Sequence, residues 1–287
     1  MSAVRPQRPY GAIEHLSIAL LIGMHAACLL VFVVPFSLPV LALALGSYLL
    51  RMWAITAGFH RYFSHRSFKT SRAFQFLLGL LGTSAMQNGP IWWASWHRHH
   101  HRFTDEPRDV HSPLQHGFWH AHMGWILASD SDRPDTSNVN DLTRFPELCW
   151  LDRHKWLPMV AYGIGCFAIA GVSGLVWGFV VSSVLVLHAT AFVNSVGHIW
   201  GTRRYATLDT SRNNLLIALI TLGEGWHNNH HHAQYSARQG FRWWEIDLTY
   251  YVLWALERIG VIWDVRAPST KTRRRTALPA AASGAEL

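Results

Sequence analysis

Two long stretches without a single Asp, Glu, Lys or Arg constrain this chain more than any other feature: residues 16–50 and residues 156–202. A bilayer core takes about 20 helical residues to cross, so each stretch is long enough for two spans. Each is broken once, by a Pro-rich segment at 35–39 and by a Gly-rich segment at 171–174. The pattern predicts an all-α integral membrane fold with four spans in two helical hairpins, at residues 16–34, 40–59, 157–170 and 175–192.

The charged residues lie mainly outside these hairpins, and basic residues outnumber acidic ones by 25 to 17, a net charge of +8. Only 15% of the residues are charged, where a soluble domain carries about 25%. The positive-inside rule places both termini and the polar segments in the cytoplasm, where they would form a helical cap. We expect the positive charge to meet membrane lipid and no nucleic acid. A buried helix pair of a soluble core is the alternative reading of one hairpin.

Residues 1–268 are interpreted as a single membrane domain and residues 269–287 as a basic, disordered tail that rests on anionic lipid. Between the hairpins, residues 73–96 are uncharged but contain Gly, Gln, Asn and Pro, which favours an interfacial helix and a loop over a fifth span. The three cysteines, Cys28, Cys149 and Cys166, are odd in number and are interpreted as buried apolar residues, not as a disulfide or thiolate site.

The chain also has 19 histidines, most of them grouped next to the expected spans. Positions i, i+3 and i+4 of a helix share a face, and adjacent positions diverge by about 100°. Two sets should therefore converge, each with one member free to serve a second metal: His97, His100 and His101 in one, and His227, His230 and His231 in the other. His99 and His232 should point away. Facing helices of this kind build dinuclear sites in helical bundles.

Two further pairs belong to the same pattern. His60 and His65 are five residues apart and can share a metal only if the helix ends or unwinds between them, whereas Asn194 and His198 share a helical face. A surface histidine cluster is the alternative for any single group, but three groups on one side of the membrane favour metal. The groups contain no cysteine, which disfavours structural zinc and iron–sulfur centres, and so many imidazoles favour a dinuclear redox iron site. His15, His25, His116, His154 and His188 have no such neighbours.

Taken together, these elements resemble the integral-membrane fatty acyl desaturases, specifically the stearoyl-CoA (delta-9) group. The resemblance rests on H-x4-H at His60, H-x-x-H-H at His97, N-S-x-x-H at Asn194 and G-E-G-W-H-N-x-H-H at Gly223, in that order. It implies two iron ions (Fe²⁺/Fe³⁺) and O2 as co-substrate. One iron would be bound by His60, His65, His97, His101 and His231. The other would be bound by His100, His198, His227 and His230, with Asn194 acting through a water. Glu224, Asp105 and Asp109 are candidate acceptors for the imidazole N–H groups.

The implied reaction is O2-dependent introduction of a cis double bond, delta-9 in this group, into a long saturated acyl chain. Acyl-CoA is the expected carrier, and acyl-phospholipid and acyl-carrier protein are the alternatives, because the group's CoA-binding positions read Ser95-Trp96 and Ala128-Ser129 here. Asn88 and Trp93 match the group's substrate-binding positions, and Tyr48 on the second span could close the acyl tunnel. Without a fused haem motif, electrons would come from a separate ferredoxin, rubredoxin or cytochrome b5 with its reductase.

Two other functions remain open at this point. The same scaffold could hydroxylate its substrate, because an iron oxidant that abstracts hydrogen can also return oxygen. A histidine-rich metal transporter is the alternative from another class, and it predicts ionisable residues at mid-bilayer depth. Among the histidines, His25 and His188 alone lie deep in the expected spans, and the three groups lie at their cytoplasmic ends.

Overall fold

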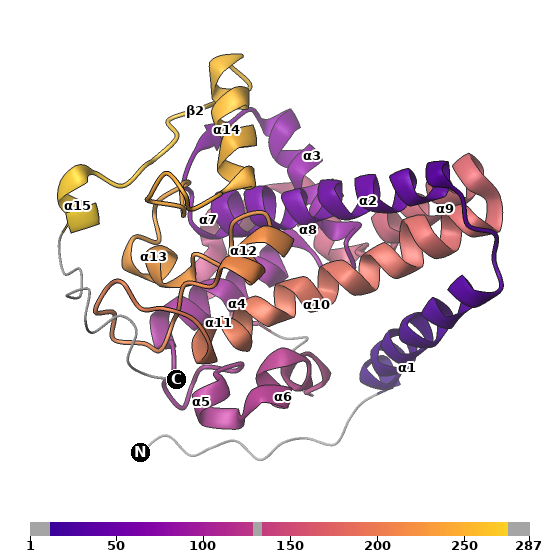
Figure 1. The fold of residues 1–287 in the computed structure, drawn as a ribbon, viewed down its shortest axis with the longest axis horizontal. Helices are drawn as coiled ribbons and strands as arrows, with labels where there is room; N and C mark the ends of the chain where they lie inside the picture. Colours follow the sequence, from indigo (N-terminus) through magenta and orange to yellow (C-terminus); the bar gives the residue numbers. More distant parts are fainter. Residues whose placement is uncertain (1–11, 129–133, 275–287) are drawn as a thin grey trace.

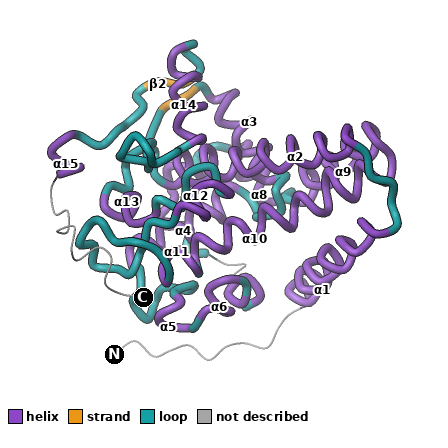
Figure 2. The backbone as a smooth tube through the Cα atoms, viewed as in Figure 1, coloured by secondary structure: helices purple, strands orange, loops and turns teal. Residues whose placement is uncertain are grey.

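The fold of the computed structural model is built almost entirely from helices (Figures 1 and 2). The structure describes residues 12–128 and 134–274. The apolar part of the fold contains α1 (Ala12–Ala27), η1 (Cys28–Phe32), α2 (Leu38–Trp53), η2 (Ala54–Ser64), α9 (Trp156–Ser173), η5 (Gly174–Val181) and α10 (Ser182–Asn194). The helical class expected from the sequence is therefore confirmed for the described residues.

The helix breaks fall where the sequence places them. Ser37 caps the start of α2 through its side chain, which accepts from the Val40 N–H, and Pro39 follows in the first turn. The second long apolar segment turns back at Gly171, whose φ of +58° is open to glycine at no steric cost. The helix α9 then packs against η5, the first part of the returning helix that continues as α10 (Figure 1).

Among the described residues, two helices are long and apolar enough to cross a membrane: Leu38–Ser64 and Trp156–Ile199, of which the second is continuous only across the kink at Gly171. A shorter apolar helix covers Ile18–Phe32. Outward-facing side chains on these helices are apolar and exposed, as at Ile22 (63%), Phe32 (83%) and Ile169 (71%). These findings support membrane helices at the expected positions, while the four spans and their orientation stay predictions.

The remaining elements gather at one end of the apolar helices. They are β1 (Lys69–Thr70), α3 (Arg72–Thr83), α4 (Pro90–Phe103), α5 (Pro113–His116), α6 (Phe118–His122), η3 (Gly124–Leu127), η4 (Thr136–Val139), α7 (Asn140–Thr143), α8 (Pro146–Arg153), α11 (Val196–Ile199), α12 (Leu215–Ile220), α13 (His227–His232), α14 (Leu248–Arg258), β2 (Ile262–Trp263) and α15 (Thr270–Arg274). In the part of the chain that the structure describes, one small sheet pairs β1 with β2 antiparallel, with Lys69 opposite Trp263. The main core lies between η2, α3, α4 and α8, around Phe59, Phe63, Leu78 and Leu148.

Two expectations are corrected by these elements. The segment 73–96 forms parts of two helices, because α4 begins at Pro90 after a turn in which Met86 and Asn88 take positive φ. The tail is helical at its start, where α15 covers Thr270–Arg274 and the Tyr205 hydroxyl donates to the Arg273 carbonyl. The rest of the expected tail, 275–287, lies outside the described residues.

Arg51 is fully buried in α2, where its guanidinium lies against η5 and α10. It donates to the hydroxyl of Ser183 at 2.7 Å, to that of Ser182, and to the carbonyls of Gly178 and Phe179 at 3.5 and 3.4 Å. The π-helical turns of η5 shift the local hydrogen-bond pattern, and the guanidinium supplies donors at that point. No carboxylate is among the described partners of Arg51, so serines and carbonyls carry the solvation of this charge.

Three histidines that the sequence left without neighbours, or did not single out, form a hydrogen-bonded chain from α1 to α6. His25 Nδ1 donates to the Leu21 carbonyl at 2.7 Å, and its Nε2 lies 2.9 Å from His188 Nε2. His188 Nδ1 lies 3.0 Å from His122 Nε2, and His122 Nδ1 lies 3.0 Å from the Ser195 hydroxyl. This chain of hydrogen bonds links α1 to α10 and α6.

Candidate metal centre

The helix that carries the first histidine pair is a π-helix at the point where the pair occurs. In η2 the backbone bonds run from i to i+5, and the His65 N–H continues the pattern by donating to the His60 carbonyl at 3.2 Å. Residues five apart thereby become neighbours, with the two ring centres 4.8 Å apart. The sequence required the helix to end or unwind here, and the wider π-turn is the local change that brings the two imidazoles together.

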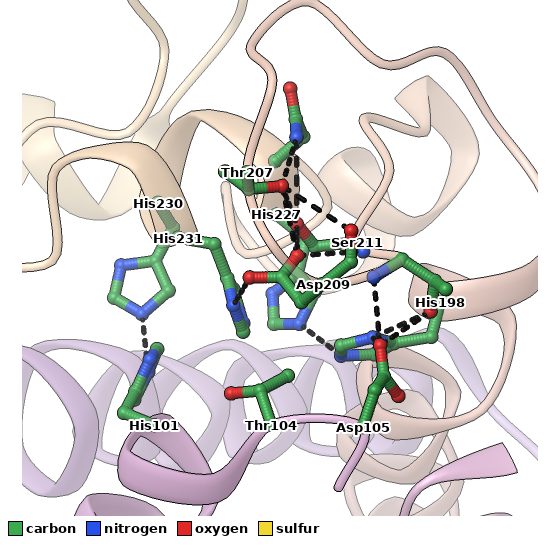
Figure 3. Close-up of polar contacts among 12 residues, drawn as sticks. His101, Thr104, Asp105, His198, Thr207, Asp209, Ser211, His227, His230 and His231 are labelled. Carbon is green, nitrogen blue, oxygen red and sulfur yellow. Dashed lines mark hydrogen bonds and ion pairs between the residues drawn. The ribbon is translucent and has the colours of Figure 1, made fainter. Parts of the chain in front are cut away.

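The other donors come from α4, α11 and α13. The turn before α13 depends on two glycines: Gly223 has φ of +131°, and a Cβ on Gly225 would lie 2.1 Å from the Ala218 nitrogen. This close approach places His227, at the start of α13, beside His198 of α11, and their Nε2 atoms lie 3.0 Å apart. The backbone of the G-E-G-W segment thus explains why His227 meets His198 (Figure 3).

All nine predicted histidines fall into two compact groups in which the possible ligand atoms lie within 4.8 Å of one another. The first group contains His60, His65, His97, His101 and His230. The second group contains His100, His198, His227 and His231. His99 and His232 belong to neither group, as expected, since they bond to the carbonyls of Arg108 and Thr272.

One assignment from the sequence is wrong. His230 lies with the first group, where its Nε2 is 3.0 Å from that of His60 and 2.9 Å from that of His101, and His231 lies with the second (Figure 3). The expected sets had these two exchanged. Adjacent helical residues diverge by about 100°, which separates the pair but leaves the direction of each to the tertiary packing of α13.

Acidic side chains orient several of these rings by accepting hydrogen bonds from Nδ1. Asp109 accepts from His100 Nδ1 and from His111 Nδ1, each at 2.9 Å, and Glu224 accepts from His60 Nδ1 while Arg61 donates to its other oxygen at 2.9 Å. Asp105 Oδ2 is 3.5 Å from His198 Nδ1. The three acids expected as acceptors therefore occupy those positions. The rings of His60 and His198 are turned so that Nε2 faces another histidine.

Two participants were missed by the sequence reading. Asp209 accepts from His231 Nδ1 at 3.0 Å and is itself held by the Ser211 N–H and the Thr207 hydroxyl (Figure 3). Asp209 lies in an irregular loop, where no helical spacing points to it. His111 joins Asp109 two residues away, and the short D-x-H spacing was the signal that could have identified it.

The electrostatics favour neutral imidazoles and ionised acids. Burial, together with the neighbouring His97 and His231, lowers the pKa of His101 well below its usual range. For His231, burial lowers the pKa to about 4 although Asp209 opposes it. Burial alone would raise the pKa of Glu224, but His60 and Arg61 outweigh it and hold that pKa at about 2. Neutral imidazole is the form that binds a metal ion.

The donor set fits two metal ions of a kind that imidazole prefers. Buried nitrogens such as His231 Nε2 have no hydrogen-bond partner among the described residues, and in the pairs above two Nε2 atoms face each other at about 3 Å. A neutral imidazole carries one N–H, so the ring of His60, whose Nδ1–H is given to Glu224, presents an Nε2 lone pair to the facing His230. Converging lone pairs are stabilised by a cation between them.

Two cavities adjoin the first group. A cleft runs from α1 to Trp93, His97 and Asn194, and a smaller inner cavity continues from these three residues to Met52 and Ile55 of α2 and η2. Trp93 stacks on His97 with ring centres 4.8 Å apart. Asn88 lines the cleft and accepts from Lys155 Nζ at 2.6 Å. Tyr48 lines neither cavity; its hydroxyl donates to the Ile220 carbonyl at 2.5 Å, next to Thr221 of the inner cavity.

Comparisons with known proteins agree with this arrangement. The profile of the fatty acid desaturase family matches residues 35–265. Over 275 residues, 94% of this chain and 74% of the relative, the chain is 38% identical to a chloroplastic palmitoyl-monogalactosyldiacylglycerol delta-7 desaturase of Arabidopsis thaliana. It is 39% identical to delta-9 acyl-lipid desaturase 1 of the same plant (89% and 84% covered), and 37% identical to an acyl-CoA 5-desaturase of Anemone leveillei (93% and 84% covered).

Proposed function

Since the chain belongs to the fatty acid desaturase family, we propose that it introduces a cis double bond, delta-9 by its resemblance, into a long saturated acyl chain with O2 as co-substrate. The balanced reaction converts –CH2–CH2–, O2, two electrons and two protons into –CH=CH– and two waters. The observation that carries the proposal is the junction of an apolar cleft and an inner cavity at His97, a member of the first histidine group.

Two iron ions are proposed as the cofactor, one held by each histidine group, with Asn194 acting on the second through a water. Bound iron would supply the O2 activation and hydrogen abstraction that an unactivated methylene requires. The protein's own residues set the geometry: Asp109, Glu224 and Asp209 hold the Nδ1 protons of His100, His60 and His231, which keeps the Nε2 lone pairs directed inward.

The cavity residues would select and position the chain. Substrate carbons near the junction would lie against the flat face of Trp93, while the methyl end extends into the inner cavity toward Met52. An apolar lining excludes water from a substrate that has no polar handle at the reacting carbons. Asn88 lies at the outer part of the cleft with Lys155 and is proposed to contact the carrier end of the substrate.

Tyr48 is proposed to limit the length of the substrate's acyl chain. It does not line the inner cavity itself, but its hydroxyl holds the Ile220 carbonyl next to Thr221, which does. Tyr48→Ala should release the Ile220 carbonyl, let the inner cavity deepen and shift products toward longer chains. Fatty acid methyl esters from cells fed a mixture of C14 to C20 saturated acids would measure this. An unchanged chain-length profile would remove Tyr48 from the substrate residues.

The remaining expectations complete the proposal: a separate ferredoxin, rubredoxin or cytochrome b5 with its reductase as electron donor, and a multi-pass membrane location with the termini and active site on the cytoplasmic side. The decisive experiment expresses the chain in a desaturase-deficient host and analyses its lipids. We expect O2-dependent unsaturation with two irons per chain, both lost in His100→Ala and His230→Ala. Full activity in both variants would contradict the proposal, and a hydroxylated product would point to the alternative reaction.

A further inference from the structure

The cleft that leads to the histidines is walled on one side by the apolar helix α1. Ile18, Leu20 and Leu21 of α1 line it, opposite Leu187 and Ala191 of α10. The hydrogen-bonded chain through His25 and His188 fixes α1 in this place. Other side chains of α1, such as Ile22, are exposed and apolar, as expected for a helix in lipid. A cleft that borders such a helix would begin at the level of the bilayer.

The rim of the cleft has the character of a membrane interface. Leu20 of α1 and Trp156 of α9 both line the cleft and are both 38% exposed, so the opening passes between these helices. Trp156 lies at the first residue of α9 and Lys155 just precedes it. Tryptophan and lysine at the end of an apolar helix are typical of the headgroup region. A substrate at this rim would have its polar end at headgroup depth.

The charge on the cleft is too small for a coenzyme A headgroup. Lys155 is the one Lys or Arg among the described residues that line it; the other outer residues are mainly apolar, including Trp92, Trp125 and Leu127. Coenzyme A carries several phosphate charges, and phosphates are ordinarily met by clusters of Arg and Lys. A single lysine suits one phosphodiester.

We propose that the substrate is a diacyl glycerolipid of the surrounding bilayer, whose acyl chain enters sideways between α1 and α9 while its phosphate or other headgroup stays near Lys155 and Trp156. This rests on the proposed desaturase function and revises the acyl-CoA carrier expected from the sequence. The lipid need not leave the membrane, because its acyl chain reaches Trp93 and His97 along the apolar cleft.

The test compares two carriers in one preparation. The iron-loaded protein is reconstituted in vesicles of 1-stearoyl-2-oleoyl phosphatidylglycerol with reduced ferredoxin and O2, and deuterated stearoyl-CoA is added. The two pools are separated at early times and analysed for double bonds by mass spectrometry. We expect the glycerolipid stearoyl group to react at least tenfold faster. A rate on stearoyl-CoA equal to or above it overturns the inference while leaving the desaturase function intact; absence of reaction in both pools contradicts the function itself.

A pair of variants tests the route. Leu21→Trp places a bulky ring in the cleft, whereas Ile22→Trp places it on the exposed face of the same helix. We expect Leu21→Trp to reduce glycerolipid desaturation at least tenfold at unchanged iron content, and Ile22→Trp to leave it near the original rate. Ile18→Trp, also in the cleft, serves if Leu21→Trp does not fold. Equal rates in the cleft and surface variants overturn the sideways route.

Discussion

Asp109 serves two imidazoles at once, one oxygen for His100 and one for His111, and it is completely buried. Burial alone would raise its pKa, but His100 and His111 more than offset burial and hold the pKa well below its usual range. The carboxylate is therefore ionised across the physiological range and can accept two N–H bonds. The Asp105 backbone N–H also donates to Oδ2 at 3.0 Å, so a ring that turned away would give up a charge-assisted hydrogen bond without leaving that oxygen unpaired.

Asp109→Asn tests this shared acceptor. The amide retains one oxygen and directs an NH2 group at the second ring, so His100 or His111 loses its acceptor. Iron affinity should fall about 10- to 100-fold, the usual cost of losing such a partner. Iron per chain, titrated at limiting iron, measures it. Glu106→Gln, at an exposed acid that pairs with Arg108, is the control and should bind iron normally. Normal iron affinity in Asp109→Asn as well would show that iron binding does not depend on Asp109.

The sequence located all nine histidines but not their division between the groups. The spacing of His97, His100 and His101 sufficed because all three lie on one regular helix, α4. The short α13 left two ways to divide His230 and His231, and the choice depends on how the helix docks against η2 and α11. Asp209 could not be found, because its position depends on loop bonds to Ser211 and Thr207 rather than on a repeating pattern.

Among the elements, α7 ties the segment after η2 to α4. Asp141 accepts from Arg66 Nε at 2.7 Å and from Arg98 Nη1 at 2.8 Å. Burial alone would raise the pKa of Asp141, but the hydrogen bonds from Arg98 and Arg66 outweigh it and lower that pKa. A carboxyl whose folded pKa is depressed stabilises the fold above its unfolded pKa and loses that contribution as pH falls through the folded value.

Asp141→Asn should therefore destabilise the protein by about 1–2 kcal/mol at pH 7, after allowance for partial exposure. The difference in the free energy of unfolding between the variant and the original protein should stay constant from pH 8 to 5. It should narrow below about pH 4, the ordinary pKa range of an aspartate. Thermal unfolding in detergent measures both. Asp264→Asn breaks the exposed pair with Lys69 and should have almost no effect at any pH; a gap that widens in acid would contradict the Asp141 assignment.

The packing of α2 against η5 and α10 depends on the forked guanidinium of Arg51. Arg51→Lys keeps the charge but offers three donors from one point, so it cannot reach Ser182, Ser183 and the η5 carbonyls together. We expect a loss of about 3–5 kcal/mol, as for other broken buried networks. Thermal unfolding compares it with Arg153→Lys at an exposed site on α8, which should be neutral. Equal stability of the two variants would show that an ammonium group can replace the forked guanidinium at position 51.

For the whole molecule, the sequence predicted the apolar helices and their breaks well, because charge-free stretches and Pro or Gly clusters are local signals. It could not predict that His25, His188 and His122 meet, since they come from three distant elements. It also missed the second helix of segment 73–96, because the positive φ of Met86 and Asn88 is a tertiary consequence. Helix positions are thus local properties, whereas polar contacts between helices depend on the assembled bundle.

The net charge of +8 carries a prediction for the molecule as a whole. Exposed arginines of the cap, among them Arg102, Arg242 and Arg258, should attract an acidic electron donor. Raising NaCl from 50 to 300 mM should lower kcat/KM for ferredoxin several-fold through screening, while the KM for the lipid stays constant. Stopped-flow reduction and product analysis separate the two. If the rate of reduction by ferredoxin did not change with NaCl, the electron donor would dock on an apolar surface instead.

The buried position of Arg51 also has a consequence for the order in which the chain enters the membrane. Its serine partner Ser182 lies 131 residues further along, so a ribosome adding about 5–20 residues per second supplies it roughly 7–26 s after Arg51. During that interval α2 carries an unsolvated charge worth about 3 kcal/mol against insertion. The first hairpin should therefore remain with the insertion machinery until α10 emerges, which makes the synthesis of the second hairpin a step in the integration of the first.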